Sequence, residues 1–595
     1  MKQNKVRMLI ISLLGAMAIC AEGSAQPQQF TAGSGIAAGL PTPVSIYCNW
    51  SAYDEMSDSV RLTEALAMRE LNEILRLRKQ GVRVDYYLMD AFWYEPKGGY
   101  RSWRKADWPD GPDRWLEACK ANHLKPGLWF SANRLDEGLL ELVPEWENSL
   151  APDKRYLSLF EGNYLDHLME TLQLYADKGI KLFKFDFAGF GAATAEGKKK
   201  YTHAEIVDKN RQAFMQAIRK FRSKNPDVII ISYNGFGGYQ KNTITPFSQT
   251  VDLRSRWLEI FDAMYCGDPR LSDLPMMNFW RSKDLYSDHM VRQYLYNGVP
   301  LSRIDNFAVL LGTTGTCYRR GIAAWKGTLI LSYARGGWLN SYNGNLELLS
   351  DADAAWFATV QRTFLALQQF GHTTVWGDIP GTGNPYGYRS ATMDGSVFTV
   401  VNPGHEVREI DLPEDSAGRV LFHDKGFRPA IRDGKLLLGP EQLAVVGFGR
   451  YASAQYDWGV EDDVIIPQAS ELLPVEIENV DAHSARVRLT PPQNRHLHVF
   501  FTQCDKDGHP LRSWGGAPPN GIPMNRFLTL SARQGKKTIP LTIEYDKMIW
   551  SGLSWAAGEI DAASLDPRKP LEITCTAKDG ESKYFRIEVY AVRYE

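Results

Sequence analysis

Short apolar runs alternate with longer amphipathic stretches between about residues 40 and 370. The apolar run "VSIYCNW" (44–50) precedes a helical stretch over 57–79, and "VDYYLMD" (84–90) precedes a helix that begins near 110–112. Parallel strands need a long crossover connection, which is usually a helix, so repeated strand–helix units indicate a parallel sheet.

The alternation continues along the chain. Further strands are expected at 125–131, 180–187, 227–234, 299–305 and 327–334, and further helices at 164–178, 203–224 and 351–369. About eight such units in roughly 330 residues predict a (β/α)8 TIM barrel over 40–371, in the α/β class. The stretch 235–298 is the least regular, and periodicity alone places no strand in it.

The pattern changes after about residue 372. Short alternating strands separated by Gly, Pro, Asp and Asn predict an antiparallel β-sandwich over 372–455. A polar stretch near 456–470 follows, and a second strand-rich segment over 470–595 predicts another β-sandwich, which we treat as a possible carbohydrate-binding module. A chain of 595 residues is too long for one hydrophobic core, which agrees with several domains.

The N-terminus has the form of a secretory signal. Basic residues precede the apolar run Met8–Ala21, and small residues at 23–25 form a candidate cleavage site, so residues 1–25 are interpreted as a signal peptide. The protein is therefore expected to be secreted or periplasmic. A lipoprotein anchor at Cys20 is the weaker alternative, because Ile19 is larger than the small residue that usually precedes such a cysteine.

The amino-acid composition limits the classes of partner and ligand that the sequence indicates. The net charge is −2 and no long basic run is present, so neither nucleic acid nor an anionic membrane surface is indicated, and no later stretch has the length of a membrane span. The 11 histidines show no metal-binding spacing, and no phosphate-binding or dinucleotide motif follows a strand. The 17 Trp and 27 Tyr residues are numerous, and flat aromatic faces suit sugar rings.

Two charged residues interrupt the apolar run "IKLFKFDF" (180–187). Lys184 and Asp186 lie two positions apart and point to one side of a strand, while the phenylalanines point to the other. Burying a charge costs several kcal/mol unless it is paired, so the pair requires a reason. In a TIM barrel the active site forms where the strands end, and Asp90 and Asn234 also end predicted strands.

Asp186 is a candidate carboxylate nucleophile, because Lys184 two residues before it favours the ionised form. Covalent glycosidase chemistry would need a second carboxyl group opposite the first, to protonate the leaving oxygen and then to activate water. The irregular region offers five candidates, and spacing alone does not choose among them: Asp262, Asp268, Asp273, Asp284 and Asp288.

Five motifs in order resemble the clan D glycoside hydrolases, families 27 and 36, which include α-galactosidases. They are "VDYYLMDAFW", "GLWFSANRL", "KLFKFDF", "SYNGFGG" and "FWRSKDLYSDHMVRQY". The resemblance covers about residues 44–300, and it implies a barrel followed by a β-sandwich. It also implies that the Asp of Lys-x-Asp, here Asp186, is the nucleophile.

The resemblance assigns further roles. It places the acid/base on Asp284 with Arg281 beside it, and it matches Asp90 and Trp93 to the motif after the second strand. Trp129 falls in the Gly-Leu-Trp-Phe motif of the third strand. The segment "MYCGDP" instead resembles the acid/base element of α-glucosidase-like barrels, which makes Asp268 a rival to Asp284 for this role.

The expected function is therefore that of a secreted retaining glycoside hydrolase acting on terminal α-galactosyl or related α-glycosyl residues. No cofactor or metal is required, because two carboxylates carry the reaction. The alternatives are an α-glucosidase or transglycosylase on the same barrel, or a non-catalytic carbohydrate-binding surface protein. The residues expected to contact an oligosaccharide or polysaccharide substrate are Asp90, Trp93, Trp129, Lys184, Asn234, Asp268 and Arg281.

Overall fold

The computed structural model describes most of the chain, and the expected signal peptide lies outside the described residues. The described ranges are 42–51, 61–237, 255–313, 323–414, 417–511, 522–523, 526–543, 547–548, 554–578 and 584–595. Among these residues, no helix has both the length and the apolar character needed to cross a membrane.

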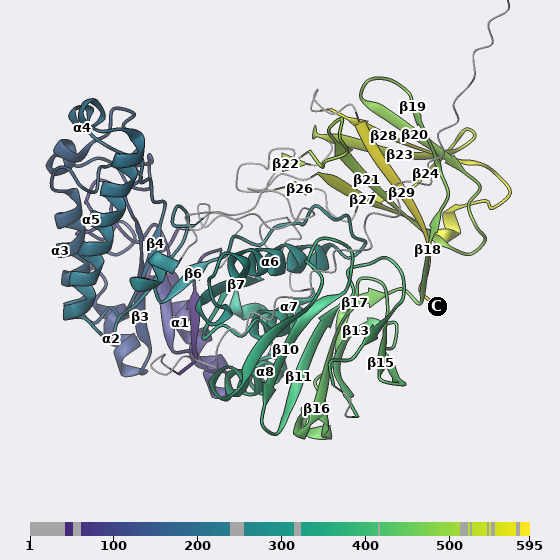
Figure 1. The fold of residues 1–595 in the computed structure, drawn as a ribbon, viewed down its shortest axis with the longest axis horizontal. Coiled ribbons are helices and arrows are strands. Elements are labelled where there is room, and N and C mark those ends of the chain that lie inside the picture. Colours follow the sequence, from purple (N-terminus) through teal and green to yellow (C-terminus); the bar gives the residue numbers. More distant parts are fainter. Residues whose placement is uncertain are drawn as a thin grey trace, which may run out of the picture.

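Eight parallel strands form a closed barrel in chain order, as the sequence predicted (Figure 1). β8 pairs with β1 and closes the barrel. The strands are β1 (Val44–Cys48), β2 (Tyr86–Met89), β3 (Lys125–Ser131), β4 (Leu182–Asp186), β5 (Ile229–Ser232), β6 (Ala263–Tyr265), β7 (Ile304–Leu311) and β8 (Leu339–Gly344).

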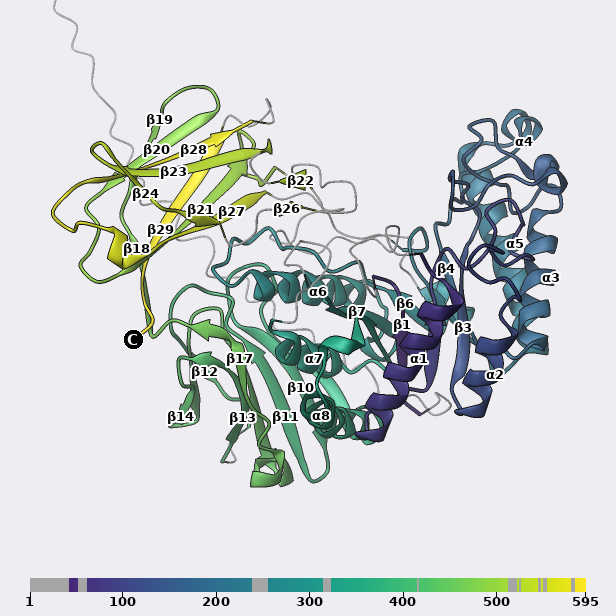
Figure 2. The same ribbon diagram turned by 180° about the vertical axis from the view of Figure 1, so that it is seen from behind.

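The helices follow the strands in the expected alternation, and α3 and α5 form one end of the molecule in both ribbon views (Figures 1 and 2). Thr202 begins α5 with a capping box, in which its hydroxyl and the Glu205 carboxylate each accept a backbone N–H. The helices are α1 (Glu64–Lys79), α2 (Asp113–Ala121), α3 (Tyr164–Asp177), α4 (Ala195–Lys200), α5 (His203–Lys224), α6 (Phe279–Tyr296), α7 (Trp325–Ala334) and α8 (Asp351–Phe370).

Strand β4 shows why an apolar strand with two charges is stable. Phe183 packs edge-on against Phe221 of α5, with ring centroids 5.5 Å apart, and Phe185 packs in the same way against Phe214 at 5.4 Å. Lys184 lies on the opposite face of the strand and points into the barrel, as the period of two predicted. The phenylalanines therefore attach the strand to its helix and leave the inner face free for polar groups.

Three expectations about the barrel elements are wrong or incomplete. The run 327–334 is helix α7 and not a strand, and β8 follows at 339–344. Nearly all of α7 is buried, so its apolar residues show no one-sided pattern that separates a buried helix from a buried strand. The expected strand at 299–305 starts later, at Ile304, after a 3₁₀ turn. β6, in the irregular region, has three residues and is too short to show a period.

The first β domain packs against the barrel helices α7 and α8, and its core is continuous with that of the barrel. Phe422 contacts Trp356 and Trp458 contacts Phe364, with ring centroids 5.9 and 5.7 Å apart. The larger sheet has the order β17–β13–β16–β11–β10–β9. Its strands are β9 (His372–Gly377), β10 (Tyr386–Thr392), β11 (Gly395–Val401), β13 (Arg419–Gly426), β16 (Leu443–Gly449) and β17 (Gly459–Ile466).

A smaller three-stranded sheet completes this domain. It consists of β12 (Arg408–Asp411), β15 (Lys435–Leu438) and β14 (Ala430–Arg432), paired antiparallel. Strand β17 lies within the polar stretch 456–470, where no strand was expected, and it pairs with β13 in parallel rather than antiparallel. Its charged residues Asp462 and Asp463 are exposed, whereas the buried Glu461 is part of its inner face.

The second β domain is a sandwich of two five-stranded antiparallel sheets. One sheet holds β18 (Ala469–Leu473), β29 (Tyr584–Arg593), β21 (His496–Cys504), β27 (Trp555–Ile560) and β25 (Thr542–Ile543). The other holds β19 (Glu476–Asn479), β20 (Ser484–Leu489), β28 (Leu571–Ala577), β23 (Leu528–Gln534) and β24 (Lys537–Ile539). A separate two-stranded pair is formed by β22 (Ile522–Pro523) and β26 (Lys547–Met548).

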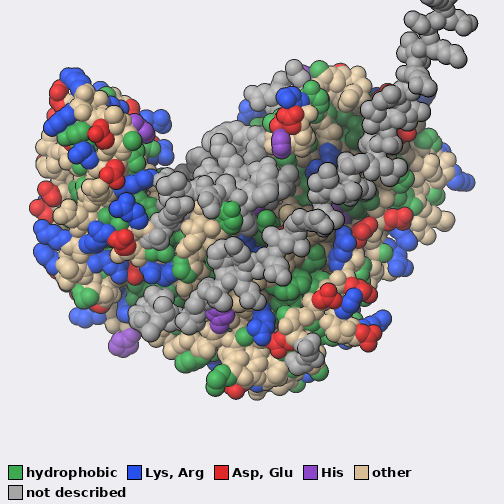
Figure 3. Space-filling model, viewed as in Figure 1, with side chains coloured by type: hydrophobic (Ala, Val, Ile, Leu, Met, Phe, Trp, Pro, Cys, Tyr) green, Lys and Arg blue, Asp and Glu red, His purple; other side chains and the backbone are tan. Residues whose placement is uncertain are grey.

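The surface charge is mixed in sign. Lys, Arg, Asp and Glu side chains are interspersed over the helices α3 to α5 in the space-filling view, without a block of one sign there (Figure 3). This distribution agrees with the net charge of −2.

Candidate active site

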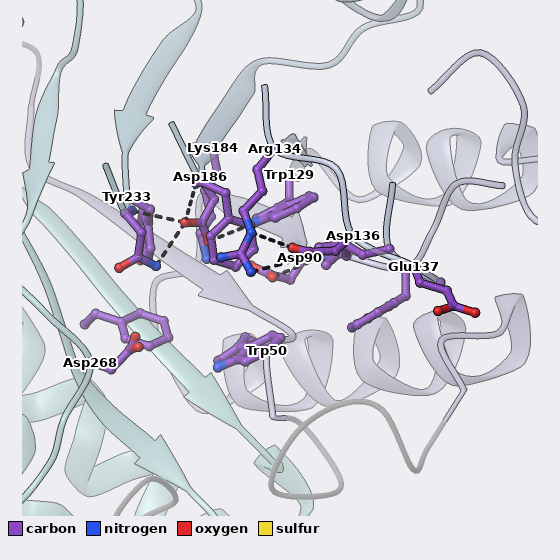
Figure 4. A pocket seen from close by; sticks show the side chains of 17 residues that line it. Trp50, Asp90, Trp129, Arg134, Asp136, Glu137, Lys184, Asp186, Tyr233 and Asp268 are labelled. Carbon is purple, nitrogen blue, oxygen red and sulfur yellow. Dashed lines mark hydrogen bonds and ion pairs between the residues drawn. The ribbon is translucent and has the colours of Figure 1, made fainter. Parts of the chain in front are cut away.

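A cavity of about 680 Å³ opens at the C-terminal ends of the barrel strands. Successive strands supply its lining, which is the usual position of a TIM-barrel active site. Trp50 follows β1, Asp90 follows β2, Asp186 ends β4, Asn234 follows β5, Asp268 follows β6 and Phe307 lies in β7. Figure 4 shows the Asp186 and Asp268 carboxylates on different walls of this cavity.

Asp186 accepts four N–H donors. Its Oδ1 accepts from Phe187 N at 2.8 Å and from both the backbone N and Nδ2 of Asn234 at 3.0 Å. Its Oδ2 accepts from Trp129 Nε1 at 3.2 Å. A carboxylate that only accepts hydrogen bonds is suited to the ionised form, and the bonds fix its orientation.

Lys184 lies beside Asp186 but pairs directly with Asp90. The distance from Lys184 Nζ to Asp90 Oδ2 is 2.7 Å, and both side chains are almost fully buried. Burial alone would lower the pKa of Lys184, but Asp90, with contributions from Cys48 and Asp186, holds it above its ordinary value. The Lys184 ammonium also lies 3.7 Å from the ring centroid of Tyr233, so it remains a charged group at the base of the cavity.

The electrostatics of Asp186 combine two opposed effects. Burial raises the pKa of Asp186 above its ordinary value, while the charge of Lys184 and the hydrogen bonds from Asn234 and Phe187 lower it. The effect that the sequence predicted for Lys184 is therefore present. It offsets part of the cost of burial instead of taking the pKa below its usual range.

Asp268 has a different environment. It lines the cavity directly after β6, and the Tyr265 hydroxyl donates a hydrogen bond to its Oδ1. Burial raises the pKa of Asp268 to about 6, although the hydrogen bond from Tyr265 opposes the rise. A carboxyl group with such a pKa can hold a proton in weakly acidic solution and donate it, which is the property a general acid needs.

Of the five acidic candidates in the irregular region, Asp268 lines the cavity and the other four do not. Asp262 pairs with Arg222 at 2.7 Å, and Asp273 accepts a hydrogen bond from Ser554 in the second β domain. Asp288 pairs with Arg335 at 2.7 Å. Each of these carboxylates has a structural partner away from the cavity.

The assignment of Asp284 as acid/base is corrected by its position. Asp284 lies on α6 with no exposed surface, where Arg281 Nη1 contacts its Oδ2 at 2.6 Å. Thr328 Oγ1 donates to its other oxygen at 3.0 Å. Arg281 in turn binds Asp424 of the first β domain at 2.9 Å, so it is not a substrate ligand either. The expected motif is thus a buried ion network that attaches α6 to the first β domain.

Of the two tryptophans expected from the sequence to contact a substrate, only one lines the cavity. Trp129 lines the cavity, as expected, and donates to Asp186. Trp93 is fully buried among the aromatic rings of Tyr94, Trp103 and Phe130, and its Nε1 donates to the backbone oxygen of Trp129 at 3.2 Å. It supports the strand that carries Trp129 instead of contacting a substrate.

Several cavity residues were not predicted. Trp50 and Tyr233 lie at the ends of the predicted strands 44–50 and 227–234, so their position at a strand end was a signal that could have identified them. Arg134 and Asp136 come from the loop after β3 and form an ion pair at 2.7 Å (Figure 4). Their loop has no periodic pattern, and only the folded chain brings it to the cavity.

Tyr233 and Tyr265 connect the surroundings of Lys184 and Asp186 to those of Asp268. Their rings stack with centroids 4.1 Å apart and an interplanar angle of 12°. Tyr233 contacts Lys184 and donates to Asp305 at 3.0 Å, whereas Tyr265 donates to Asp268. The nucleophile candidate and the acid candidate are therefore supported by one rigid aromatic wall.

One group of described residues has ligand atoms close enough together to hold a metal ion, and it lies far along the chain from the cavity residues. Asp505, Asp507 and His509 have ligand atoms within 4.8 Å of one another. Asp505 accepts the backbone N–H groups of Asp507 and His509 at 2.8 and 2.9 Å, so these residues form a hydrogen-bonded turn after β21.

Fold and site together define a (β/α)8-barrel protein in which the Asp186 and Asp268 carboxylates have different environments in one cavity. No family model and no curated protein matches the chain. Similar solved structures include the galactosidase domain of the α-galactosidase–sucrose kinase AgaSK, at 14% identity and a TM-score of 0.48, with 70% of this chain and 55% of that chain covered.

Two further similar structures come from Geobacillus stearothermophilus. The GH36 α-galactosidase AgaA has 13% identity and a TM-score of 0.48, with 70% of this chain and 56% of that chain covered. The GH27 β-L-arabinopyranosidase Abp has 13% identity and a TM-score of 0.44, with 69% and 98% covered. The match spans little more than half the length of the two α-galactosidase chains. At these values the likeness is one of fold.

Proposed function

We propose that this protein is a retaining glycoside hydrolase that removes terminal α-galactosyl or closely related α-glycosyl residues. One observation carries the proposal: Asp186 and Asp268 line a single cavity, one oriented by four N–H donors and the other with a pKa raised to about 6. Two carboxyl groups in such different environments match the nucleophile and the acid/base of a retaining enzyme.

In the first step the Asp186 carboxylate attacks the anomeric carbon and forms a glycosyl ester. The bond to the leaving oxygen breaks as Asp268 transfers its proton to that oxygen. In the second step the Asp268 carboxylate removes a proton from water, the water oxygen attacks the anomeric carbon, and the ester bond to Asp186 breaks. Asp268 is then protonated again, and the sugar is released with its original anomeric configuration.

The remaining cavity groups have roles in binding. Asp90 and Lys184 form a charged pair at the base of the cavity, where hydroxyl groups of a sugar can donate to the carboxylate and accept from the ammonium. Trp50 and Trp129 supply aromatic faces along the wall. A volume of about 680 Å³ lies in the range of pockets for small ligands, so one sugar ring with part of its leaving group fits.

The nucleophile is tested by Asp186→Asn. This variant keeps the shape of the side chain but cannot form the glycosyl ester, so kcat/KM for an aryl α-galactoside should fall by about 10⁴-fold or more. The wild-type enzyme should release the α-anomer first, which proton NMR of the product detects. Equal rates for the two proteins would refute the assignment.

The acid/base is tested by Asp268→Ala with added azide. Azide attacks the glycosyl ester without needing a base, so it should restore turnover of an activated aryl substrate in this variant. Asp284→Ala is the matched control, because its carboxylate lies outside the cavity. That variant should lose stability and show no azide rescue, whereas rescue of Asp284→Ala alone would return the role to Asp284.

The sugar specificity of the enzyme is tested with a panel of aryl glycosides. We expect the highest kcat/KM with α-galactoside and lower values with α-glucoside and β-L-arabinopyranoside. Addition of a sugar acceptor separates hydrolysis from transglycosylation, because a transferase would form a new glycoside. Treatment with a chelator should leave the rate unchanged, since the proposed reaction uses two carboxylates and no metal.

We further propose that the protein is exported by its N-terminal segment, on the evidence of the basic residues and the apolar run Met8–Ala21. Fractionation of expressing cells should locate the mature chain outside the cytoplasm. The mass of the mature N-terminus should show cleavage near residue 25, and a lipid attached at Cys20 would contradict this route.

A further inference from the structure

The loop that carries Asp268 is enclosed by both β domains. This β6–α6 loop, residues 266–278, runs from the end of β6 to the start of α6. Gly267 has a φ of +109°, a backbone conformation that other residues rarely adopt, and it turns the chain just before Asp268. Beyond Asp268 the loop leaves the cavity and enters the interior of the molecule.

Apolar residues of this loop belong to the core of the second β domain. Leu271 and Met277 are 1% and 8% exposed, and they pack with Phe279 in the same hydrophobic cluster as β21, β27 and β29. Loops normally run over the protein surface, so burial of these side chains in another domain's core is a specific arrangement. The barrel and the second β domain thus share part of one core at this loop.

Polar contacts attach the loop to strand β27 and the residue before it. Trp555 Nε1 donates to the Ser272 backbone oxygen at 2.8 Å, and Ser554 Oγ donates to Asp273 Oδ1 at 3.2 Å. All four residues are buried. A buried backbone oxygen that loses its only strong donor costs about 1–3 kcal/mol, so these bonds define where the loop lies.

The first β domain holds the other end of the loop. Glu441, only 2% exposed, accepts the backbone N–H groups of Met277 and Asn278. His405 contacts the same carboxylate at 2.8 Å, and its ring packs against Phe500 of the second β domain with centroids 4.8 Å apart. The two β domains and the loop therefore meet at one buried junction, and α6 lies between the β domains in both ribbon views (Figures 1 and 2).

We infer that the second β domain positions the acid/base: it holds the β6–α6 loop so that Asp268 faces the cavity at the distance its proton transfer needs. This inference rests on the proposed function for the role of Asp268. Trp555 is a positioning residue, because it acts through Ser272 and has no contact with the cavity. The domain thereby has a part in catalysis that needs no glycan binding of its own.

A displaced β6–α6 loop should impair one step of the reaction, the donation of a proton by Asp268 to the leaving group. Proton donation by Asp268 matters for a leaving group that departs poorly as an anion, and it matters little for one that departs readily. A misplacement of about 1 Å in a catalytic group can lower a rate by about 10²-fold. Displacement of the loop should therefore slow cleavage of poor leaving groups selectively, while attack by Asp186 remains intact.

The test uses Trp555→Phe in the full chain with two substrates, phenyl α-galactoside and 2,4-dinitrophenyl α-galactoside. The phenylalanine keeps most of the ring but loses the N–H donor. We expect kcat/KM to fall about tenfold or more for the phenyl substrate and by less than about twofold for the dinitrophenyl substrate. The parameter kcat/KM is used because it reports the first step alone.

Two controls keep the test decisive. Val487→Ala lies in the core of the second β domain, on the sheet opposite Trp555, and should leave the ratio of the two kcat/KM values unchanged. Ser554→Ala removes the second bond to the loop and should change the ratio in the same direction as Trp555→Phe, which covers the case that the latter does not fold.

A double variant separates the two proposals. In an Asp268→Ala background the acid is already absent, so Trp555→Phe should cause no further selective loss with the phenyl substrate. If Asp268→Ala shows no dependence on the leaving group, the proposed function is wrong. If Asp268→Ala shows it but neither Trp555→Phe nor Ser554→Ala does, only the positioning role is overturned, and the domain serves another purpose.

Discussion

Asp186 and Asp268 carry the same carboxyl group in different surroundings. Asp186 accepts N–H groups from Trp129, Phe187 and Asn234, which leaves little freedom in its orientation. Asp268 has a hydrogen bond from the Tyr265 hydroxyl, and burial raises its pKa to about 6. Environment, rather than residue type, therefore gives the two groups their different chemical abilities.

The hydrogen bond from Tyr265 has a measurable effect on pH dependence. Because Asp268 must be protonated to act as an acid, kcat/KM should decrease as the pH rises through about 6. The Tyr265 hydroxyl stabilises the ionised carboxylate, so Tyr265→Phe should raise the pKa of Asp268 and move this decrease to higher pH. The pH profile of kcat/KM for phenyl α-galactoside measures the shift.

Tyr233→Phe provides the matched control for this prediction. Tyr233 stacks on Tyr265 but donates to Asp305 instead of Asp268. Its loss should leave the pH of the decrease where it is, even if the rate falls. A profile that moves equally in both variants would show that packing of the aromatic wall, and not the hydrogen bond, determines the pKa of Asp268.

At the scale of elements, helix α1 supports the end of β2 through a buried acid. Glu70 is 2% exposed and accepts hydrogen bonds from the Tyr87 hydroxyl and from Asn49, at 3.3 Å in the second case. Asn49 also accepts the Asp90 backbone N–H at 2.8 Å. The helix is thus connected to the base of the cavity through side chains that local sequence patterns do not reveal.

Glu70 should make the stability of the protein depend on pH. Burial raises its pKa from 4.5 to about 8, so between these values the native state keeps a proton that the unfolded state releases. The free energy of unfolding should therefore decrease as the pH rises from about 4.5 to 8. Glu70→Gln removes this dependence and should gain stability relative to the wild type at pH 8, with less gain at pH 5.

Urea unfolding followed by tryptophan fluorescence at the two pH values measures the difference. Glu73→Gln on the same helix is the control, because Glu73 is partly exposed and pairs with Arg76. It should shift the unfolding free energy by a similar small amount at both pH values. A gain for Glu70→Gln that does not depend on pH would mean that Glu70 is ionised in the native state.

At the scale of the whole molecule, the division of the hydrophobic core into two large clusters predicts how the domains unfold. The barrel and the first β domain share one continuous hydrophobic cluster, whereas the second β domain has its own cluster joined to the barrel through the β6–α6 loop. Domains with a common core unfold together, and a separate core permits a separate transition.

Calorimetry of two core variants tests this division. Val445→Ala, in the first β domain, should lower the temperature at which the barrel unfolds and activity is lost, because its cavity costs the shared core about 2 kcal/mol. Val487→Ala should instead lower a transition of the second β domain. A single transition that both substitutions shift equally would show that the β6–α6 loop couples all three domains into one unit.

Much of the barrel could be predicted because its patterns are local. The limits of α5 coincide with the expected 203–224, since a capping box begins the helix and its apolar face repeats at the helical period. The two faces of β4 followed from a period of two. Lys184, Asp186, Asp90 and Asn234 were found for the same reason, because a polar residue at the end of an apolar strand is visible in the chain itself.

The candidates for the acid/base role illustrate what a local pattern does not supply. Asp284 and Asp268 are both acidic residues of the irregular stretch 235–298, in which periodicity placed no strand, and motif resemblance favoured the first. Their difference lies in partners distant in sequence: Arg281 joins Asp284 to Asp424 of the first β domain, whereas Asp268 faces the cavity. Helix α7 was mistaken for a strand for a related reason, because neighbours on every side remove the one-sided pattern.

The sequence by itself therefore determined the barrel, the two β regions and the strand-end groups around Asp186, because periodicity and chain order are properties of neighbouring residues. The tertiary structure alone decided which acidic residue of the irregular stretch lines the cavity with Asp186, which tryptophans reach the cavity and what the second β domain contacts. These depend on long-range packing: Arg281 is buried beside Asp424, which is 143 residues away, and Trp555 donates to Ser272, which is 283 residues away. A linear pattern does not contain that information.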